Sequence, residues 1–190
     1  SGMGPHQVTY VSDGYKDIQL VVIGQNSVDT IIKTAFIHIH PTPYAMVSND
    51  TAVCEGNSVS LQASGGADYQ WKPSAYLDDS TIANPISIPS VSISYIVNII
   101  DSNGCVDTAQ ISIAVYPLPK VSVMSSKTSV CEADSILLTG QGAEYYNWNH
   151  NVINGTPYYI DTTRSFQVIG MDTNGCQDTA VITILVYENP

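Results

Sequence analysis

The sequence predicts an all-β chain built from tandem β-sandwiches, and three observations lead to this prediction. A turn centred on Asn-Gly occurs twice, at residues 101–108 and 172–179, each time between two runs of alternating apolar residues. Asn and Gly tolerate the positive φ of a tight hairpin turn, so each copy predicts a closing β-hairpin. Short strand-like runs with turn signals fill most of the chain. No stretch of useful length has the 3.6-residue apolar period of a helix, so helix should be nearly absent.

The strands that flank the two turns belong to two copies of one repeat. Residues 95–100 and 109–116 flank the first turn, and residues 166–171 and 180–187 flank the second. Apolar residues alternate along each run, as they do in a strand with one buried face. Each turn is therefore expected to join the last two strands of its own domain.

Each copy also carries, in the same order, a cysteine, an alternating run, a Gly-rich turn and an aromatic strand that ends on tryptophan. These are Cys54 and residues 58–63, 65–66 and 69–71 in the first copy, and Cys131 and residues 135–139, 140–142 and 146–148 in the second. A tryptophan on the third strand and an aromatic residue at the start of the penultimate strand are typical of an immunoglobulin-like sandwich. Trp71 and Trp148 are therefore expected in the two cores.

Residues 1–41 show a different pattern. Strands are predicted at residues 7–11, 15–23 and 31–40, separated by turns that contain glycine. Three strands cannot close a sandwich. This segment is therefore expected to be the C-terminal half of a domain whose first half is missing from the chain.

Two short proline-containing segments, residues 41–43 and 117–119, predict stiff joints between domains, because proline stops a strand and restricts the backbone. The predicted domains are residues 1–41, 42–117 and 118–190.

The chain of 190 residues is acidic, with six Lys and Arg against seventeen Asp and Glu and a net charge of -11. This charge argues against binding to nucleic acid or to an anionic membrane, because both need a basic surface. No apolar run is long enough to span a bilayer, and no signal segment starts the chain. Four cysteines in a lysine-poor, strand-rich chain favour an exported protein, and they lack the Cys-x-x-Cys pairs of zinc sites. The chain is expected to be a piece of a longer protein.

Several motifs of the first repeat resemble the Ig-like repeats of gliding-motility-associated surface proteins of Bacteroidetes; they lie at residues 54–59, 65–73, 82–85, 94–97 and 103–105. Residues 1–41 are similar to the end of the PKD (polycystic-kidney-disease) repeats in the same proteins, through motifs at residues 4–6, 8–10, 14–15 and 28–30. The resemblance implies a partial PKD-like sandwich followed by two Ig-like repeats. It also implies export by the type IX secretion system as part of a large cell-surface protein.

The four cysteines, Cys54, Cys105, Cys131 and Cys176, leave two disulfide patterns open. Each repeat can close its own bond, Cys54 with Cys105 and Cys131 with Cys176. In an Ig topology, however, a strand of ordinary length separates the two cysteines of one repeat by about 20 Å, whereas a disulfide needs Cα atoms within about 7 Å. Cys54 can instead bond Cys176 across the joint, which leaves Cys105 and Cys131 to pair with domains outside this chain. Free thiols are the third possibility.

Side chains with oxygen atoms surround both turns and are weak calcium candidates: Asp101, Asn103 and Asp107, with their copies Asp172, Asn174 and Asp178. The simpler interpretation is that they form the turns by hydrogen bonding to the nearby backbone. Asp78, Asp79 and Ser80 are a similar weak group.

His38 and His40 lie two residues apart on a predicted strand and therefore face the same way, but two ligands make only half a metal site. No metal and no cofactor is expected. No catalytic constellation is predicted either, because a nucleophile needs a positioned base and the other histidines, His6 and His150, fall in predicted loops. We therefore expect no enzyme activity in this chain.

A further resemblance concerns modification. In exported proteins of Bacteroidetes, Asp followed by Ser or Thr and then an aliphatic residue resembles an O-glycosylation signal, which implies candidate sites at Thr30, Thr51, Thr108, Ser135 and Thr179. The alternative interpretation is that Asp-Thr begins a strand well.

The predicted function is a non-catalytic stalk or spacer in a large exported, adhesin-like cell-surface protein. Two alternatives stay open: an Ig-like module that binds a glycan or a protein, and an accessory region of a secreted hydrolase. The expected partners are neighbouring domains of the same protein, together with cell-surface proteins, secretion-machinery proteins or extracellular glycans. Neither nucleic-acid binding nor membrane insertion is expected.

Overall fold

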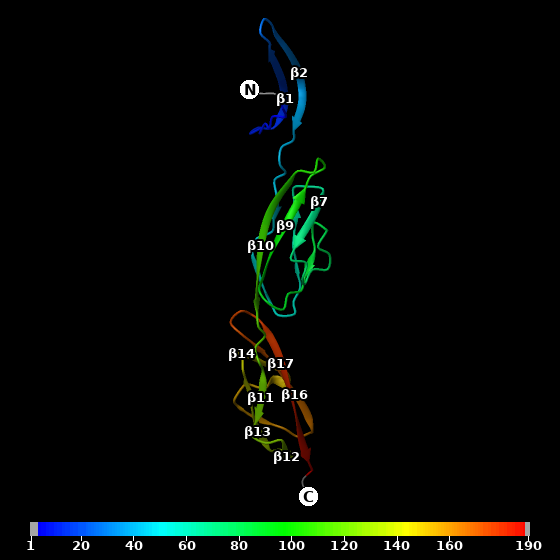
Figure 1. Ribbon diagram of the computed structural model, residues 1–190. Helices are drawn as coiled ribbons and strands as arrows, with labels where there is room; N and C mark the ends of the chain where they lie inside the picture. Colours follow the sequence, from blue (N-terminus) through cyan, green and yellow to red (C-terminus); the bar gives the residue numbers. More distant parts are fainter. Residues whose placement is uncertain (1–3, 189–190) are drawn as a thin grey trace. The chain divides into compact units, whose positions relative to one another are not determined.

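The computed structural model describes residues 4–188, and strands make up almost all of its regular structure (Figure 1). The ends of the first and last predicted domains, residues 1–3 and 189–190, lie outside the described residues. Within the described range the one helical element is a single 3₁₀ turn, Asn149–Asn151. The all-β prediction is confirmed.

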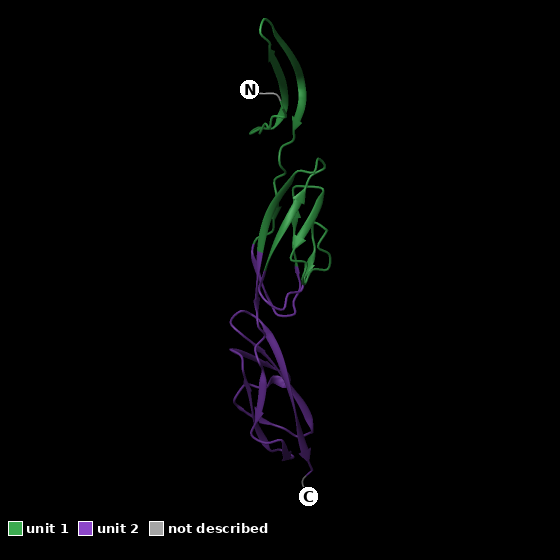
Figure 2. Ribbon diagram, viewed as in Figure 1, with its two compact units in different colours: residues 1–49, 60–87, 94–111 green, residues 50–59, 88–93, 112–190 purple. Residues whose placement is uncertain are grey.

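The chain divides into two compact units (Figure 2). Unit 1 comprises residues 1–49, 60–87 and 94–111, and unit 2 comprises residues 50–59, 88–93 and 112–190. The sequence predicts three domains that are each continuous in the chain, and their boundaries stay predictions.

The N-terminal part of unit 1 contains a two-stranded antiparallel sheet of β1 (Gly14–Ile23) and β2 (Val28–Ile39). The pairing is irregular between Lys16 and Ile18. There the Asp17 carboxylate accepts the N–H of Ala35 at 2.8 Å, and Ala35 adopts a left-handed φ of 50°. The Asp17 side chain thus provides a hydrogen-bond partner for the Ala35 N–H where the pairing is irregular.

The strand predicted at residues 7–11 is wrong, because no strand forms there. Val8, Tyr10 and their neighbours have the alternation of a strand, but a strand also needs a partner for its backbone groups. β1 pairs with β2 in a sheet of two strands, so residues 7–11 are not part of it.

Residues 46–116 form one four-stranded sheet and two short ribbons. The sheet has the order β4-β10-β9-β7, with β4 at Thr51–Cys54, β7 at Asp68–Lys72, β9 at Ile93–Ile100 and β10 at Val106–Tyr116. The ribbons pair β3 (Met46–Val47) with β6 (Ala63–Ser64) and β5 (Val59–Ser60) with β8 (Ile86–Ser87).

The single strand predicted at residues 58–63 is therefore wrong in detail, since it is divided into β5 and β6. The chain changes partner within this run. The N–H of Leu61 donates to the carbonyl of Pro85 at 2.9 Å, and the carbonyl of Gln62 accepts the N–H of Ser48 at 2.9 Å. The backbone bonds to one segment at Leu61 and to another at Gln62, which explains why the run forms two strands.

Residues 122–187 repeat the same plan in unit 2. One sheet has the order β12-β17-β16-β14, with β12 at Ser129–Cys131, β14 at Tyr145–Trp148, β16 at Arg164–Met171 and β17 at Gln177–Tyr187. The other has the order β11-β13-β15, with β11 at Ser122–Ser125, β13 at Ser135–Gln141 and β15 at Pro157–Tyr159. The order of the four-stranded sheets matches strand for strand, so the sequence repeat is also a structural repeat.

The core of unit 1 surrounds Trp71, which is 2% exposed. Its Nε1 donates to the carbonyl of Ile82 at 2.9 Å, and its ring lies edge-on to Tyr95 with 6.5 Å between centroids. The Tyr95 hydroxyl is hydrogen-bonded to Ser87 at 2.9 Å and donates to the carbonyl of Ala75 at 2.7 Å. Burial raises the pKa of Tyr95, because its charged form would lose solvation.

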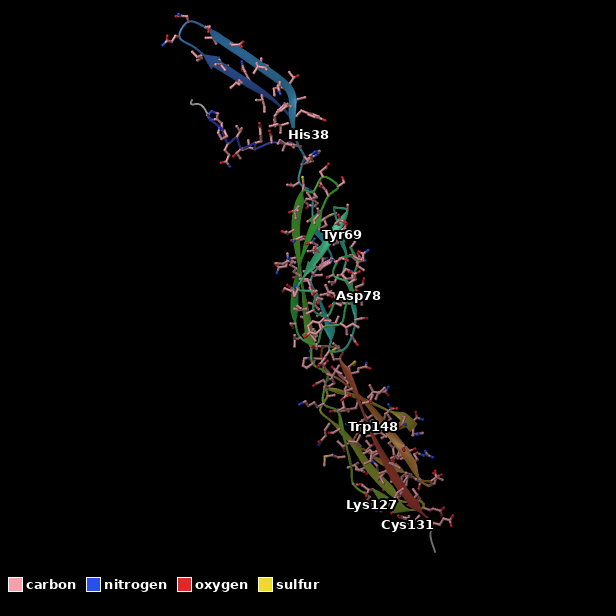
Figure 3. The ribbon with its side chains drawn as sticks, turned by 45° about the vertical axis from the view of Figure 1, so that its right-hand side comes forward. His38, Tyr69, Asp78, Lys127, Cys131 and Trp148 are labelled. Atoms are coloured by element: carbon pink, nitrogen blue, oxygen red, sulfur yellow. A yellow bond between two sulfur atoms is a disulfide. The ribbon has the colours of Figure 1, made fainter. Side chains whose placement is uncertain are left out.

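The core of unit 2 has the same centre. Trp148 is 7% exposed and its Nε1 donates to the side chain of Asn154 at 3.1 Å (Figure 3). Buried aliphatic side chains and Phe166 surround it; the full cluster is Val130, Ile136, Leu138, Trp148, Val152, Ile160, Phe166, Val168 and Ile184. Side chains from both sheets of unit 2 enter this cluster, as in a sandwich. The prediction that both tryptophans are core residues is confirmed.

Replacing Trp148 by Ala is expected to lower the free energy of unfolding by about 3–5 kcal/mol, because the change leaves a cavity and removes apolar contacts. Urea unfolding followed by circular dichroism measures this loss. The matched control is Tyr145→Ala on the same strand, because Tyr145 is 58% exposed; it should cost about 0.5 kcal/mol. Equal losses in the two variants would contradict the central role of Trp148.

Candidate functional site

The turn between β9 and β10 is organised by the carboxylate of Asp101. Its Oδ1 accepts the N–H groups of Asn103 and Cys105, each at 2.8 Å, and its Oδ2 accepts the side-chain amide of Asn103 at 3.4 Å. The N–H of Gly104 donates to the carbonyl of Asp101 at 3.1 Å, and Gly104 has a φ of 82°. Only the glycine of the Asn-Gly pair is left-handed, so the turn is closed by the Asp side chain and by Gly104.

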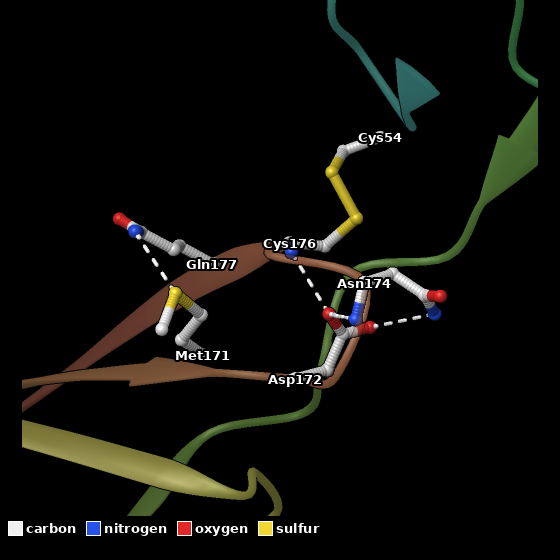
Figure 4. Close-up of a disulfide and its surroundings, with 6 residues drawn as sticks. All are labelled: Cys54, Met171, Asp172, Asn174, Cys176 and Gln177. Carbon is white, nitrogen blue, oxygen red and sulfur yellow. Dashed lines mark hydrogen bonds between the residues drawn. A yellow bond between two sulfur atoms is a disulfide. The ribbon is translucent and has the colours of Figure 1, made fainter. Parts of the chain in front are cut away.

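The turn between β16 and β17 has the same construction. Oδ1 of Asp172 accepts the N–H groups of Asn174 at 2.9 Å and Cys176 at 2.8 Å, and Gly175 has a φ of 83° (Figure 4). The N–H of Asp172 donates to the carbonyl of Cys176 at 3.0 Å, as Asp101 does to Cys105. Each turn therefore holds its cysteine in the same backbone setting.

A disulfide joins Cys54, the last residue of β4, to Cys176 in the second turn. The Cα atoms are 5.5 Å apart, and the two residues are separated by 122 positions in the sequence. Both belong to unit 2. Of the two pairings that the sequence left open, the structure contains the one that connects the two repeats. Cys105 is a half-buried free thiol, and Cys131 is an exposed one.

Strand length explains why neither repeat closes its own bond. β17 has 11 residues; Cys176 comes directly before its first residue, and Cys131 lies opposite its last residue, Tyr187. At about 3.3 Å per residue, the strand separates these two cysteines by roughly 35 Å. A disulfide needs Cα atoms within about 7 Å. In the first repeat Cys54 lies opposite Tyr116 at the end of β10, so the same argument applies.

The second aspartate of each turn motif fixes the start of its own repeat. Oδ2 of Asp107 accepts the N–H of Ala45 at 2.9 Å, and Oδ2 of Asp178 accepts the N–H of Val121 at 3.4 Å. The other oxygen of each carboxylate accepts the N–H of the next residue, Thr108 or Thr179, at 2.8 Å. No local sequence pattern signals this contact, because the donor lies about sixty residues upstream, with separations of 62 and 57.

Hydrogen bonds also set the acidity of two of these groups. The N–H of Cys105, together with the Asn103 donors, lowers the pKa of Asp101, and the N–H groups of Ala45 and Thr108 lower the pKa of Asp107. In both cases the donors favour the charged carboxylate. The four candidate aspartates, Asp101, Asp107, Asp172 and Asp178, thus each accept backbone N–H groups, as the simpler interpretation of these turns predicts.

No group of three or more His, Cys, Asp or Glu side chains is placed to hold a metal ion in the part of the chain that the structure describes. The oxygen-bearing side chains of the two turns stay untested, weak calcium candidates. His38 stacks on Tyr15 with ring centroids 4.1 Å apart, and His40 lies against His38 at 4.1 Å. Both histidines are therefore in aromatic contacts.

The group at Asp78, Asp79 and Ser80 also serves the local backbone. Oδ1 of Asp78 accepts the N–H groups of Asp79 at 2.7 Å and Ile86 at 2.8 Å, and the carbonyl of Ser80 accepts the N–H of Trp71 at 2.8 Å. The Thr81 hydroxyl and N–H lower the pKa of Asp79. These contacts attach the loop after Trp71 to the sheet.

The structure places the five predicted glycosylation residues on or beside strands. Thr30, Thr108 and Thr179 are exposed, whereas Thr51 and Ser135 are half-buried. In the three exposed cases the preceding Asp accepts the N–H of the Thr, at 2.8–2.9 Å. The Asp-Thr pair therefore has a structural use, and the Thr hydroxyl stays accessible. Glycosylation itself stays a prediction.

His150 and the two tryptophans also lie in packing contacts. His150 packs edge-on against Phe166 with 5.8 Å between ring centroids, within the 3₁₀ turn after Trp148. Burial removes Trp71 and Trp148 from any sugar-stacking surface. Residues 4–188 include no helix with the length and apolar content needed to cross a membrane.

No protein-family model matches the sequence, and no curated protein matches it. Among solved structures, murine CEACAM1b has a TM-score of 0.33 and 15% identity, over 75% of this chain and 100% of that chain. The N-terminal eight Ig domains of Down syndrome cell adhesion molecule have a TM-score of 0.46 and 9% identity, over 93% of this chain and 28% of that chain. The insect immune protein hemolin has a TM-score of 0.39 and 10% identity, over 91% of this chain and 56% of that chain.

Lowering the pH is expected to weaken the fold through Asp101 and Asp107. Because their pKa values are lowered from 3.8, their contribution to stability is complete above 3.8 and is lost as the pH falls through the lowered values. The urea midpoint, measured from about pH 5 to about pH 2, should therefore fall. Asp101→Asn keeps the acceptor oxygen without the charge, so its midpoint should fall less steeply. Identical pH profiles for this variant and the natural chain would contradict the assignment.

Proposed function

We propose that this chain is a non-catalytic stalk or spacer segment of a large exported, adhesin-like cell-surface protein. The repeated sandwich, the acidic composition and the disulfide support this function. The resemblance to gliding-motility-associated proteins of Bacteroidetes favours type IX secretion of the parent protein. On the same basis we propose that residues 1–41 belong to a PKD-like module and residues 42–117 and 118–190 to Ig-like modules.

The observation that carries the proposal is the Cys54–Cys176 disulfide. Tension that reaches β4 passes through Cys54, crosses the sulfur bridge to Cys176 and leaves through β17. Residues 55–175 form a closed loop outside this covalent path. They can lose their fold without adding length between the two ends. The part of the chain between Cys54 and Cys176 therefore keeps its length under load, which is what a stalk requires.

Strand pairing supports the same function when the disulfide is reduced. β4 pairs in parallel with β10, and β12 pairs in parallel with β17. In each four-stranded sheet, the strand that comes first in the sequence thus pairs with the strand that comes last. Pulling the two ends of such a repeat apart slides the paired strands along each other, so their hydrogen bonds are loaded together instead of one after another.

Surface chemistry is consistent with export. We propose that Thr30, Thr108 and Thr179 carry O-glycans in the mature protein, because their side chains are exposed beside an Asp that is already bound to the backbone. The partners of a stalk are the neighbouring domains of its own polypeptide.

A second function, glycan binding, has one observation in its favour. A hollow of 230 Å³ lies beside β14 and is lined by Tyr145, Tyr146, Asn147, Ile169, Met171 and Gln177. Aromatic rings next to amide groups are suited to a sugar. A glycan array separates the two functions: binding that Tyr145→Ala abolishes would favour the module that grips a ligand.

Single-molecule stretching between the two ends of the chain tests the stalk. With the disulfide intact, residues 55–175 should add no length; after reduction, the 122 Cα–Cα steps from Cys54 to Cys176 should add about 400 Å of contour length. Cys176→Ser should show the longer extension without reductant. Cys131→Ser keeps the bridge and is the matched control, so it should behave as the natural chain. Equal contour lengths before and after reduction would overturn the tensile path.

A further inference from the structure

Cys105 and Cys131 are each the structural copy of a cysteine that is bonded in the same chain. We propose that they are half-sites for further disulfides of the Cys54–Cys176 kind. Cys54 and Cys131 are the strand-end cysteines of their repeats, and Cys105 and Cys176 are the turn cysteines. Cys131 bonds the turn cysteine of another module of this type, and Cys105 bonds the strand-end cysteine of another such module. The inference depends on the repeat geometry and not on the mechanical function proposed above.

The two strand-end cysteines occupy the same backbone setting. Cys54 ends β4 and pairs in parallel with Tyr116, and Cys131 ends β12 and pairs in parallel with Tyr187. After each cysteine, a glutamate N–H donates to that tyrosine's carbonyl, from Glu55 at 2.8 Å and from Glu132 at 3.0 Å. The carbonyl of each cysteine then accepts an N–H from three residues ahead, at 3.0 Å and 3.2 Å.

The turn that follows each strand-end cysteine confirms the equivalence. Gly56 has a φ of 83°, and Ala133 at the matching position has a φ of 65°. Alanine rarely adopts a left-handed φ, because its Cβ crowds the backbone. The second repeat therefore keeps this turn although it has Ala133 in place of a glycine. Cys131 thus precedes the same turn as Cys54 does.

The turn cysteines are equally alike. Cys105 and Cys176 each donate an N–H to an aspartate Oδ1 at 2.8 Å, and each accepts the N–H of that aspartate at 3.0 Å. Their neighbouring glycines, Gly104 and Gly175, have φ values of 82° and 83°. The Cys54–Cys176 bond joins one strand-end cysteine to one turn cysteine. Each further disulfide of this kind therefore needs one cysteine of each type.

The free cysteines have no suitable partner within their own repeats. The roughly 35 Å length of an 11-residue strand separates Cys131 from Cys176, and Cys176 already bonds Cys54. Cys131 is exposed (Figure 3) and Cys105 is half-buried, so a partner thiol on a second module can reach both. The matching partner for each is the other type of half-site, and not another copy of itself.

The bond can form by thiol–disulfide exchange with oxidised glutathione. The Cys131 thiolate attacks one glutathione sulfur, forms a mixed disulfide and releases one glutathione thiolate. The Cys105 thiolate of a second module then attacks the Cys131 sulfur and releases the second glutathione thiolate. Two protein thiols are oxidised, and one glutathione disulfide is reduced to two thiols.

Two variants of the full chain test the proposal. Cys105→Ser retains only Cys131 as a free thiol, and Cys131→Ser retains only Cys105; both keep the Cys54–Cys176 bond. Each variant is incubated alone at high concentration in a glutathione redox buffer, and the two are also mixed in equal amounts. The products are alkylated, separated without reductant and mapped by mass spectrometry of the linked peptides.

We expect the mixture to give a heterodimer linked through Cys131 and Cys105, in several-fold excess over the homodimers of either variant. The natural chain, which has both half-sites, should give a ladder of longer species with the same link. Circular dichroism and the intact Cys54–Cys176 peptide verify that both variants are folded. Homodimers as abundant as the heterodimer, or no crosslink in the mixture, would overturn the proposal.

Discussion

Backbone hydrogen bonding along both edges of β10 and β17 is the constraint on which the rest of the structure depends. Each strand pairs in parallel with a short strand on one side and with a long strand, β9 or β16, on the other. Because β10 and β17 are long, the cysteine before each strand and the cysteine opposite its far end are kept well apart. The length of one strand thus decides which sulfur atoms can meet, and the bond that forms closes residues 55–175 into a loop.

The features that could be predicted from the sequence are those with a local cause. Asn-Gly turns between alternating runs identified the two closing hairpins, because the permitted backbone angles of glycine and the alternation of apolar residues both act over a few residues. Trp71 and Trp148 were predictable as core residues for a related reason. Each stands at a fixed distance from a cysteine within a repeated pattern, and each is large, apolar and followed by a polar turn.

What could not be predicted depends on partners that are distant in the sequence. Residues 7–11 have the composition of a strand but no strand to pair with. Residues 58–63 form two short strands because their backbone bonds to two different segments of the chain. From the sequence, Asp107 and Asp178 are weak metal-ligand candidates and also parts of a modification signal. Their carboxylates instead accept N–H groups from the start of the same repeat. No local sequence pattern predicts this contact. The disulfide was one of two open choices until the strand lengths were known.

The Cys54–Cys176 bridge also changes what a protease can do to this molecule. A single cut at any peptide bond between these residues, for example in the loop that follows Trp71, opens the closed loop but leaves both fragments joined through sulfur. The nicked protein remains one covalent molecule in an oxidising environment. Only reduction of the Cys54–Cys176 bond separates these two fragments from each other, so one cut between the two cysteines does not divide the molecule.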